Sequence, residues 1–496
     1  MASIQHFING QLTSGKSTRT HDVFDPALGV VTKQVLLAET ADVETAVAAA
    51  SEAFAKWSEM SWANRQQILF KFRELLNAKK PELAAIITEE HGKVLSDALG
   101  EVTRGQEVVE FALGAPHLAK GEHSEQVSTG VDVFSIRQPL GPVAIISPFN
   151  FPAMVPMWFF PLALATGNTV ILKPSEKDPS AAIWIAKLLT EAGLPAGVFN
   201  VVQGDKVAVD ALLEHPGIRA VSFVGSTPIA KYVYEKATAA GKRVQSLGGA
   251  KNHMLVLPDA DLDLAADAAI NAGFGSAGER CMAISALVVV EPVADLLVAK
   301  IESRMSKLTT GDGRRSCDMG PLITREHRDK VASYIDVATA DGAAVVVDGR
   351  SVQPDGDAHG FWLGPTLIDK VPITSKVYRD EIFGPVLSVI RVDSYEAGVA
   401  LINSSEFGNG TAIFTNDGGA ARRFRREVQV GMIGINVPIP VPVATFSFGG
   451  DKASIFGDLK AHGADGIRFY TKTKAVTQRW LDPSHGGINL GFPQNN

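Results

Sequence analysis

The sequence has only two cysteines, Cys281 and Cys317, in 496 residues. They cannot build a disulfide framework, so a reducing compartment, the cytoplasm, is expected. Excess positive charge is also lacking: the net charge is −7 and the pI is near 5.9. Because binding to a nucleic-acid backbone needs clustered positive charge, no nucleic-acid partner is expected. Residues 1–7 show no basic stretch followed by an apolar run, so no secretory signal is predicted there.

An uninterrupted membrane-spanning run is absent too. Residues 138–172 carry no charge and are long enough to span a bilayer. Prolines interrupt any continuous helix, however, and they stand at Pro139, Pro142, Pro148, Pro152, Pro156 and Pro161. The segment is predicted to be a buried strand, a loop, a short helix and a second strand, and no membrane partner is expected.

Helical periodicity dominates the first quarter of the chain. Residues 41–57 place Val43, Val47, Ala50 and Phe54 on one face, which predicts an amphipathic helix. Further helices are predicted at 64–78, 81–91 and 95–119. No strand pattern is evident in this quarter, so these helices are expected to cover a sheet formed by later residues.

Beyond residue 140, short β-rich runs alternate with helical runs, which is typical of a parallel sheet in an α/β protein. The predicted strands are Val143–Ser147, Thr169–Lys173, Val198–Val202, Ala220–Val224 and Lys242–Leu247, and the helices between them are near 152–166, 179–191, 207–214 and 228–240. This order predicts a doubly wound nucleotide-binding domain.

A second α/β unit is predicted after Gly248. Its strands are expected at Met254–Leu257, Ala286–Val290, Ala344–Val347, Thr366–Ile368, Val386–Val392, Gly410–Phe414 and Gly434–Val437. The proline-rich segment 437–443 cannot sustain a ladder of hydrogen bonds and is predicted to be an extended loop. Ile467–Tyr470 and Lys474–Arg479 look like edge strands. Because an exposed edge invites pairing with another subunit, an oligomer is expected.

The segment 272–282 surrounds Cys281 with small residues. Glycines at 273, 275 and 278 permit tight turns that bring backbone N–H groups close to the sulfur. Arg280 stands beside the cysteine, and a neighbouring cation favours the thiolate. Cys281 is therefore a candidate nucleophile, although a buried cysteine packed in a glycine-rich turn has the same pattern. Cys317 lacks such surroundings and is interpreted as structural.

Two strand ends have features suited to a dinucleotide. Thr227 can cap a helix after the strand 220–224, and Pro228 suits its first position, so that the helix N-terminus would face a pyrophosphate. Lys173 and Glu176 follow another strand, where a carboxylate can accept both ribose hydroxyls and repel a 2′-phosphate, which favours NAD over NADP. The G-x-G-x-x-G pattern is absent, and either stretch alone is also compatible with an ordinary turn or a solvated strand end.

Taken together, six motifs along the chain resemble the aldehyde dehydrogenase superfamily. They are Pro148-Phe-Asn-Phe-Pro152, Lys173-Pro-Ser-Glu176, Phe223-Val-Gly-Ser-Thr227, Leu247-Gly-Gly249, Gly278-Glu-Arg-Cys281 and Glu381-Ile-Phe-Gly-Pro-Val386. The stretches around residues 249–253, 279–284, 316–321 and 468–480 are similar to its CoA-acylating methylmalonate-semialdehyde branch.

The resemblance implies a role for each matching residue. Cys281 would be the nucleophile, and Asn150 with the Cys281 N–H the oxyanion hole. Lys173 and Glu176 would bind the adenosine ribose of NAD. The other cofactor positions implied are Ser147, Phe149, Lys177, Ser226, Gly248 and Glu381. No metal is expected.

One position departs from the general family pattern. Hydrolytic members carry a glutamate immediately before Leu-Gly-Gly that activates water, whereas this chain has Ser246 there. If the alignment is shifted by one residue, a glutamate is still lacking, because no carboxylate lies between Arg243 and Asn252. Since a serine hydroxyl is no general base near neutral pH, coenzyme A is expected as the acceptor of the acyl group.

Two arginines suggest an acidic substrate. Arg104 and Arg280 would hold the carboxylate of a short semialdehyde by charged hydrogen bonds. Alternatively, Arg104 forms a helix-surface pair with Glu101 or Glu107. The run Arg422–Arg426 is interpreted as a solvated helix face rather than a site for the CoA phosphates.

The expected reaction is NAD-dependent, CoA-acylating oxidation of methylmalonate or malonate semialdehyde to propionyl-CoA or acetyl-CoA with loss of CO2. The alternatives are hydrolytic oxidation of another short semialdehyde, a catalytically silent binding protein of this fold, and a cysteine hydrolase without nicotinamide. The resemblance implies an NAD-binding domain (1–122 and 141–247), a catalytic domain (248–440), a connecting loop (441–464) and an oligomerisation arm (123–140 and 465–496). A homotetramer, a dimer of dimers, is expected.

Overall fold

The computed structural model describes residues 2–480. Its first large sheet has eight strands, and the central five are parallel in the order β12-β11-β8-β9-β10. These strands are β8 (Pro142–Ile146), β9 (Thr169–Lys173), β10 (Phe199–Val201), β11 (Ala220–Val224) and β12 (Arg243–Leu247). The chain runs outward from β8 in one direction and then returns to add β11 on its other side. This confirms the predicted doubly wound sheet, and its topological switch point lies between β8 and β11.

The predicted absence of strands from the first quarter is wrong. β2 (His6–Ile8) and β3 (Gln11–Thr13) extend the large sheet beyond β10, and β20 (Ile455–Phe456) closes its other edge. β1 (Ala2–Ile4), β4 (Thr20–Asp25) and β5 (Val30–Leu36) form a small sheet of their own. β1, β2 and β3 have only three residues each, β1 and β3 are mostly exposed, and β5 is mostly half-buried, so these strands lack the apolar alternation that reveals a strand.

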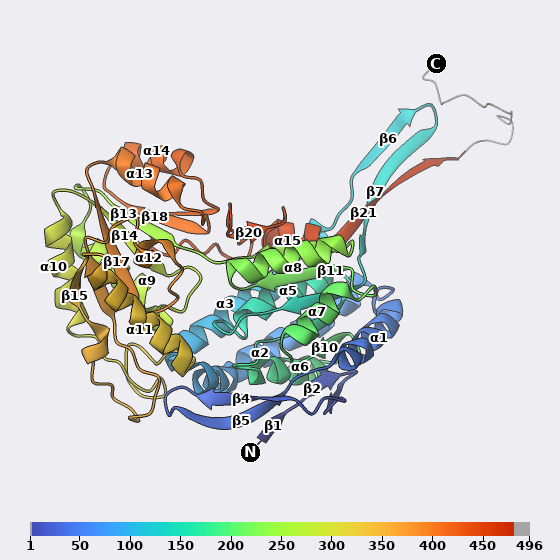
Figure 1. Ribbon diagram of the computed structural model, residues 1–496. Coiled ribbons are helices and arrows are strands. Elements are labelled where there is room, and N and C mark those ends of the chain that lie inside the picture. Colours follow the sequence, from blue (N-terminus) through green and yellow to red (C-terminus); the bar gives the residue numbers. More distant parts are fainter. Residues whose placement is uncertain (1, 481–496) are drawn as a thin grey trace.

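Helices cover both faces of the first sheet (Figure 1). They are α1 (Thr40–Trp57), α2 (Trp62–His91), α3 (Leu95–Leu113), α4 (Ala115–Leu118), α5 (Met154–Ala165), α6 (Ser180–Glu191), α7 (Lys206–Glu214) and α8 (Thr227–Ala239). The two helices predicted at 64–78 and 81–91 are one, because α2 continues through Pro81, and Leu76 and Leu83 on either side of it are fully buried. The helix predicted over 95–119 is interrupted at Gly114.

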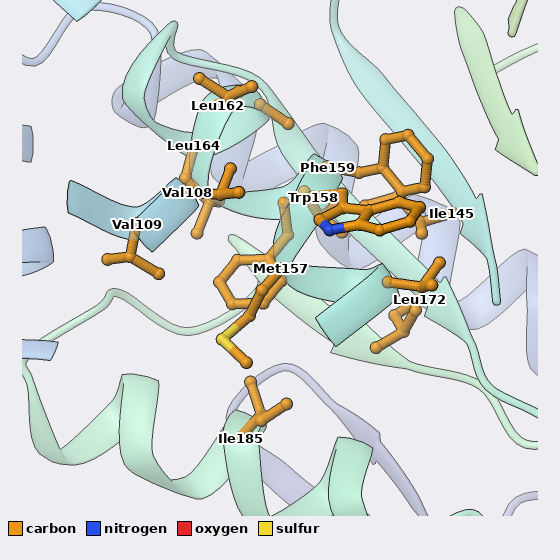
Figure 2. Close-up of a cluster of buried hydrophobic side chains, with 14 of the residues drawn as sticks. Val108, Val109, Ile145, Met157, Trp158, Phe159, Leu162, Leu164, Leu172 and Ile185 are labelled. Atoms are coloured by element: carbon orange, nitrogen blue, oxygen red, sulfur yellow. The ribbon is translucent and has the colours of Figure 1, made fainter. Parts of the chain in front are cut away.

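Helix α5 is the middle part of the uncharged segment 138–172, and the strands β8 and β9 lie on either side of it in the chain, as predicted. All residues of α5 are buried. Figure 2 shows Met157, Trp158 and Phe159 of α5 among Val108 and Val109 of α3, Ile145 of β8, Leu172 of β9 and Ile185 of α6. The apolar character of this segment therefore reflects its place in a protein core. No helix within residues 2–480 is both long and apolar enough to cross a bilayer.

The second large sheet has seven strands in the order β15-β16-β17-β14-β13-β18-β19, and all pairs except β15 with β16 are parallel. The strands are β13 (Asn252–Val256), β14 (Ile284–Val290), β15 (Ala344–Val347), β16 (Thr366–Asp369), β17 (Val386–Val392), β18 (Gly410–Phe414) and β19 (Met432–Ile435). The helices are α9 (Leu262–Phe274), α10 (Ala294–Met305), α11 (Arg325–Ala340), α12 (Lys376–Arg379), α13 (Tyr395–Ser404) and α14 (Gly418–Glu427), with short 3-10 turns η1 (Gly275–Gly278) and η2 (Gly349–Ser351). The predicted second α/β unit is confirmed.

An antiparallel sheet of β6 (His123–Ser128), β7 (Val131–Pro139) and β21 (Thr471–Arg479) projects from the body as an arm (Figure 1). The strand predicted at Lys474–Arg479 lies within β21. The one predicted at Ile467–Tyr470 is wrong, because most of this stretch belongs to helix α15 (Gly463–Phe469). Phe469 and Tyr470 are adjacent and both buried, which an alternating edge strand does not allow. Part of the predicted arm, residues 481–496, lies outside the described residues.

Candidate active site

A cleft of about 700 Å³ lies at the carboxyl ends of β8, β9, β11 and β12, where it spans the switch point. Cys281 before β14, His327 and Lys330 of α11, and residues 381–383 before β17 line its other side. A doubly wound sheet binds its ligands at this place. The cleft brings together ten of the twelve residues singled out in the sequence: Ser147, Phe149, Asn150, Lys173, Glu176, Lys177, Ser226, Gly248, Cys281 and Glu381. Arg104 and Arg280 are not among its lining residues.

A strained turn presents Cys281. Ser276 and Ala277 have φ values of 50° and 52°, a left-handed conformation that costs roughly 1–2 kcal/mol per residue. Gly278 has a φ of 72°, and a Cβ there would lie 2.2 Å from the carbonyl oxygen of Gly384. The Cys281 carbonyl accepts hydrogen bonds from the side-chain amides of Asn252 (2.9 Å) and Asn409 (3.1 Å). Backbone strain of this kind is often found at functional sites.

The expected electrostatic activation of Cys281 by Arg280 is not found. Loss of solvation raises the pKa of the Cys281 thiol to about 12, and the negative charge of Glu381 adds to the shift. The guanidinium of Arg280 lowers the pKa only weakly. Arg280 instead forms an ion pair with Asp97, 2.7 Å away, and donates to Ser276 Oγ. The thiol is therefore protonated at neutral pH when the cleft is empty.

The end of the cleft that follows β9 contains an ionised carboxylate. Lys173 Nζ lies 3.2 Å from Glu176 Oε2. Although burial alone would raise the pKa of Glu176, the neighbouring ammonium of Lys173 holds it below its usual value. The Lys177 ammonium lies 4.6 Å above the Phe149 ring. An ionised Glu176 can accept hydrogen bonds from two ribose hydroxyls.

The N-terminus of α8 opens onto the cleft. Its N-cap is Ser226 rather than the predicted Thr227, and no side chain caps the first turn. Thr227 Oγ1 instead donates to the Ala453 carbonyl and accepts the Gly249 N–H at 2.9 Å. The first N–H groups of α8 are therefore available to an anionic ligand.

Glu381 lies against Gly249 at the bottom of the cleft. A Cβ on Gly249 would be 2.3 Å from Glu381 Oε2, and the Ala250 N–H donates to Glu381 Oε1 at 2.8 Å. Burial raises the pKa of Glu381 to about 7, although the Ala250 N–H and the ammonium of Lys251 oppose the shift. The backbone can approach the Glu381 carboxylate this closely only because residue 249 is a glycine.

Ser246 does not line the cleft. It is fully buried in β12, and its hydroxyl donates to the carbonyl of Ala230 at 2.8 Å. The neighbouring Leu247, the residue concerned if the alignment shifts by one, is buried and apolar. Neither position supplies a carboxylate to the cleft.

Sequence reasoning missed a group of aromatic and titratable residues behind Phe149. The Phe149 ring stacks on His91 and meets His327 and Phe383 edge-on. Glu279 Oε2 lies 3.8 Å from His91 Nε2, and Glu279 Oε1 lies 3.6 Å from His327 Nε2. Burial raises the pKa of Glu279 to about 8. Phe149, Glu279 and Phe383 lie in three of the motifs quoted from the sequence, but nothing in the sequence singled out His91 and His327, which are far from these motifs along the chain.

Arg104 lies on α3 and forms the helix-surface pair. Its guanidinium donates to Glu107 Oε2 at 2.8 Å and to the carbonyls of Val441 and Pro442, at 3.4 Å and 3.2 Å. The pair of Arg104 with Glu107, which the sequence offered as the alternative, is therefore observed. Arg104 also contacts the loop 437–443. Binding of a substrate carboxylate by Arg104 and Arg280 stays a prediction.

Comparisons with known proteins agree with this geometry. The aldehyde dehydrogenase family model matches residues 12–476. A malonate-semialdehyde dehydrogenase of Pseudomonas aeruginosa is 53% identical, covering 99% of this chain and all of that protein. The crystal structure of a methylmalonate-semialdehyde dehydrogenase from Oceanimonas doudoroffii superposes with a TM-score of 0.96 at 54% identity, over 98% of this chain and 99% of that one.

A provisionally assigned methylmalonate-semialdehyde dehydrogenase from Sinorhizobium meliloti, solved in complex with NAD, gives a TM-score of 0.96 at 51% identity, over 97% of this chain and 99% of that chain. Both the sequence match and the structural match extend over nearly the whole chain. The protein therefore belongs to the aldehyde dehydrogenase family.

Proposed function

We propose that this enzyme oxidises malonate semialdehyde or methylmalonate semialdehyde with NAD and transfers the acyl group to coenzyme A, with loss of CO2. The observation that carries the proposal is the cleft itself, which joins Cys281 and Asn150 to a dinucleotide-type groove without a glutamate at the position of Ser246. The relatives named for these two semialdehydes support the choice of substrate.

Three features of the cleft fit NAD. Glu176 is ionised and suits the ribose hydroxyls, while its charge disfavours the 2′-phosphate of NADP. The uncapped first turn of α8 suits a pyrophosphate. Glu381, held against Gly249, suits the second ribose. When bound, NAD supplies the hydride acceptor and a cationic ring that favours the thiolate form of Cys281.

The residues of the chain then act in order. Cys281 Sγ attacks the aldehyde carbon, and the Asn150 amide with the Cys281 N–H stabilises the oxyanion. Loss of the hydride from that carbon leaves a thioester on Cys281. The β-carboxylate then leaves as CO2, and the carbon that carried it takes up a proton, which balances the one lost from the Cys281 thiol. The thiol of CoA attacks the thioester and regenerates Cys281. For malonate semialdehyde, the substrate anion, NAD⁺ and CoA give acetyl-CoA, CO2 and NADH, so that atoms and charges balance.

Coenzyme A is expected to be required for turnover. Because no glutamate activates water at position 246 or 247, omission of CoA is expected to lower the steady-state rate of NADH formation by about 100-fold or more, with a burst of at most one NADH per active site. Stopped-flow absorbance at 340 nm measures both quantities, and mass spectrometry identifies the product.

Desulfo-CoA is the matched control for this experiment, since it lacks only the thiol and should not restore turnover. Hydrolysis is the alternative, and Glu381, whose pKa near 7 suits a general base, is the residue that favours it. Undiminished turnover without CoA, giving the free acid, would contradict the acceptor proposal.

Arg104 is expected to recognise the substrate carboxylate. Since a charged hydrogen bond contributes about 1.5–3 kcal/mol, Arg104→Ala should raise KM for malonate semialdehyde about tenfold or more, with KM for propanal unchanged. Arg73→Ala is the control, because Arg73 also pairs with glutamates on this helical layer. An equal rise in KM for both aldehydes would exclude a carboxylate contact, and the same pair of substrates tests Arg280→Ala.

The arm favours a homotetramer built as a dimer of dimers. β21 and β6 are both edges of a three-stranded sheet, and no further strand within residues 2–480 pairs with either of them, which suits pairing with another subunit. The two cysteines form no disulfide, which suits the cytoplasm. The domain boundaries at residues 122, 140, 247, 440 and 464 belong to this proposal as well.

A further inference from the structure

A buried lysine lies behind the proposed oxyanion site. Lys93, in the turn between α2 and α3, has a side chain with no exposed surface. Its ammonium donates to the backbone carbonyl of Asn150 at 2.6 Å and to Glu101 Oε2 at 2.7 Å. It also lies 4.4 Å from the centre of the Phe151 ring. A fully buried charge is expensive unless it is paired, and here the ammonium is paired with Glu101 and contacts the adjacent residues Asn150 and Phe151.

Glu101, on α3, completes the support. Its other oxygen, Oε1, accepts the N–H groups of Ala153 (2.9 Å) and Met154 (3.1 Å), where α5 begins. The Lys93–Glu101 pair therefore holds the segment 150–154 at both ends, through a carbonyl at one end and two N–H groups at the other. A buried charged pair linked to three backbone groups restricts the backbone more than apolar packing does.

We infer that Lys93 is a positioning residue that aims the Asn150 amide at the oxyanion formed on Cys281. Asn150 is 4% exposed, and its side-chain amide has no hydrogen-bond partner among residues 2–480, so no contact of its own holds it. Its direction follows from its backbone, which Lys93 anchors. Because an oxyanion donor must lie within a few tenths of an ångström of its place, a small shift of the backbone weakens catalysis.

This inference rests on the proposed role of Asn150. A purely structural brace is the alternative, in which Lys93 would stabilise the fold without regard to the direction of the amide. The two cases differ in their coupling to Asn150. A positioning residue loses its effect on the rate once the amide is gone, whereas a brace lowers activity by the same factor with or without it.

The test is a double-mutant cycle of Lys93→Met and Asn150→Ala, measured as kcat/KM for NADH formation with saturating CoA. Lys93→Met should lower kcat/KM about tenfold or more in the wild-type background and less than about twofold in the Asn150→Ala background. The dissociation constant of NAD, measured by calorimetry, should stay unchanged. Lys242→Met is the matched control, since the nearly buried Lys242 also donates to a backbone carbonyl, that of His215 at 2.7 Å, and it should lower Tm without lowering kcat.

Equal losses in the two backgrounds would overturn the inference. If Lys93→Met does not fold, Glu101→Gln takes its place in the same cycle, because it keeps an oxygen for the Ala153 and Met154 N–H groups and removes the charge that holds Lys93. An inactive wild type would contradict the proposed function instead, so the two failures are distinguishable.

Discussion

Replacing Cys281 by alanine is expected to lower kcat for NADH formation by about 10⁴-fold or more. The sulfur is the atom proposed to form the covalent adduct, and loss of a nucleophile removes the whole covalent route rather than one stabilising contact. NAD binding should persist, because the residues that fit the dinucleotide lie on other segments of the cleft. Stopped-flow measurement of NADH, together with calorimetric titration of NAD, tests both statements.

Cys317→Ala is the control for this variant and should keep full activity, because Cys317 does not line the cleft. Iodoacetamide should label Cys281 slowly at pH 7 in the NAD-free enzyme. Since the pKa of the thiol is raised to about 12, the rate should rise about tenfold per pH unit up to pH 10. Labelling that is fast and independent of pH would contradict the protonated resting state.

Replacing Asn150 by alanine is expected to lower kcat by about 10²–10³-fold. This is the usual cost of removing one donor from an oxyanion site. The stabilisation is specific to the charged intermediate, so KM and the NAD dissociation constant should change little. Steady-state kinetics with calorimetry measures these quantities.

Asn150→Asp is the matched variant, because it keeps the shape of the side chain and replaces the donor by an oxygen. A carboxylate repels the developing negative charge, so kcat should fall further than in the alanine variant. Recovery of activity in Asn150→Asp would show that the residue acts through shape alone, and it would remove Asn150 from the oxyanion site.

Much of the fold was predictable because the buried parallel strands carry continuous apolar sequences. Among them, β9, β11, β17 and β18 have the bounds expected from the sequence, as does the antiparallel edge strand β15. β2 was missed, although it is fully buried, because three residues give no period and it pairs with β10 at a single register position. The helix at 463–469 was mistaken for a strand because Ile467 and Phe469 alternate locally, and only burial of Tyr470 distinguishes the two.

The candidate site was predictable wherever a motif follows a strand, since parallel strands bring their carboxyl ends to one edge. The electrostatics were not predictable. Arg280 is next to Cys281 in the chain, yet it pairs with Asp97, which precedes it by 183 residues. Glu381 and Glu279 have raised pKa values because burial outweighs their partners, and burial depends on the whole fold.

The raised pKa of the Cys281 thiol has a consequence for the enzyme between catalytic cycles. Peroxide and other oxidants attack the thiolate rather than the thiol and convert it stepwise to sulfenic and then irreversible sulfinic acid. A sulfur whose proton is lost only near pH 12 is therefore a poor target while the cleft is empty. Its susceptibility to oxidation is expected to rise when bound NAD, as proposed above, favours the thiolate.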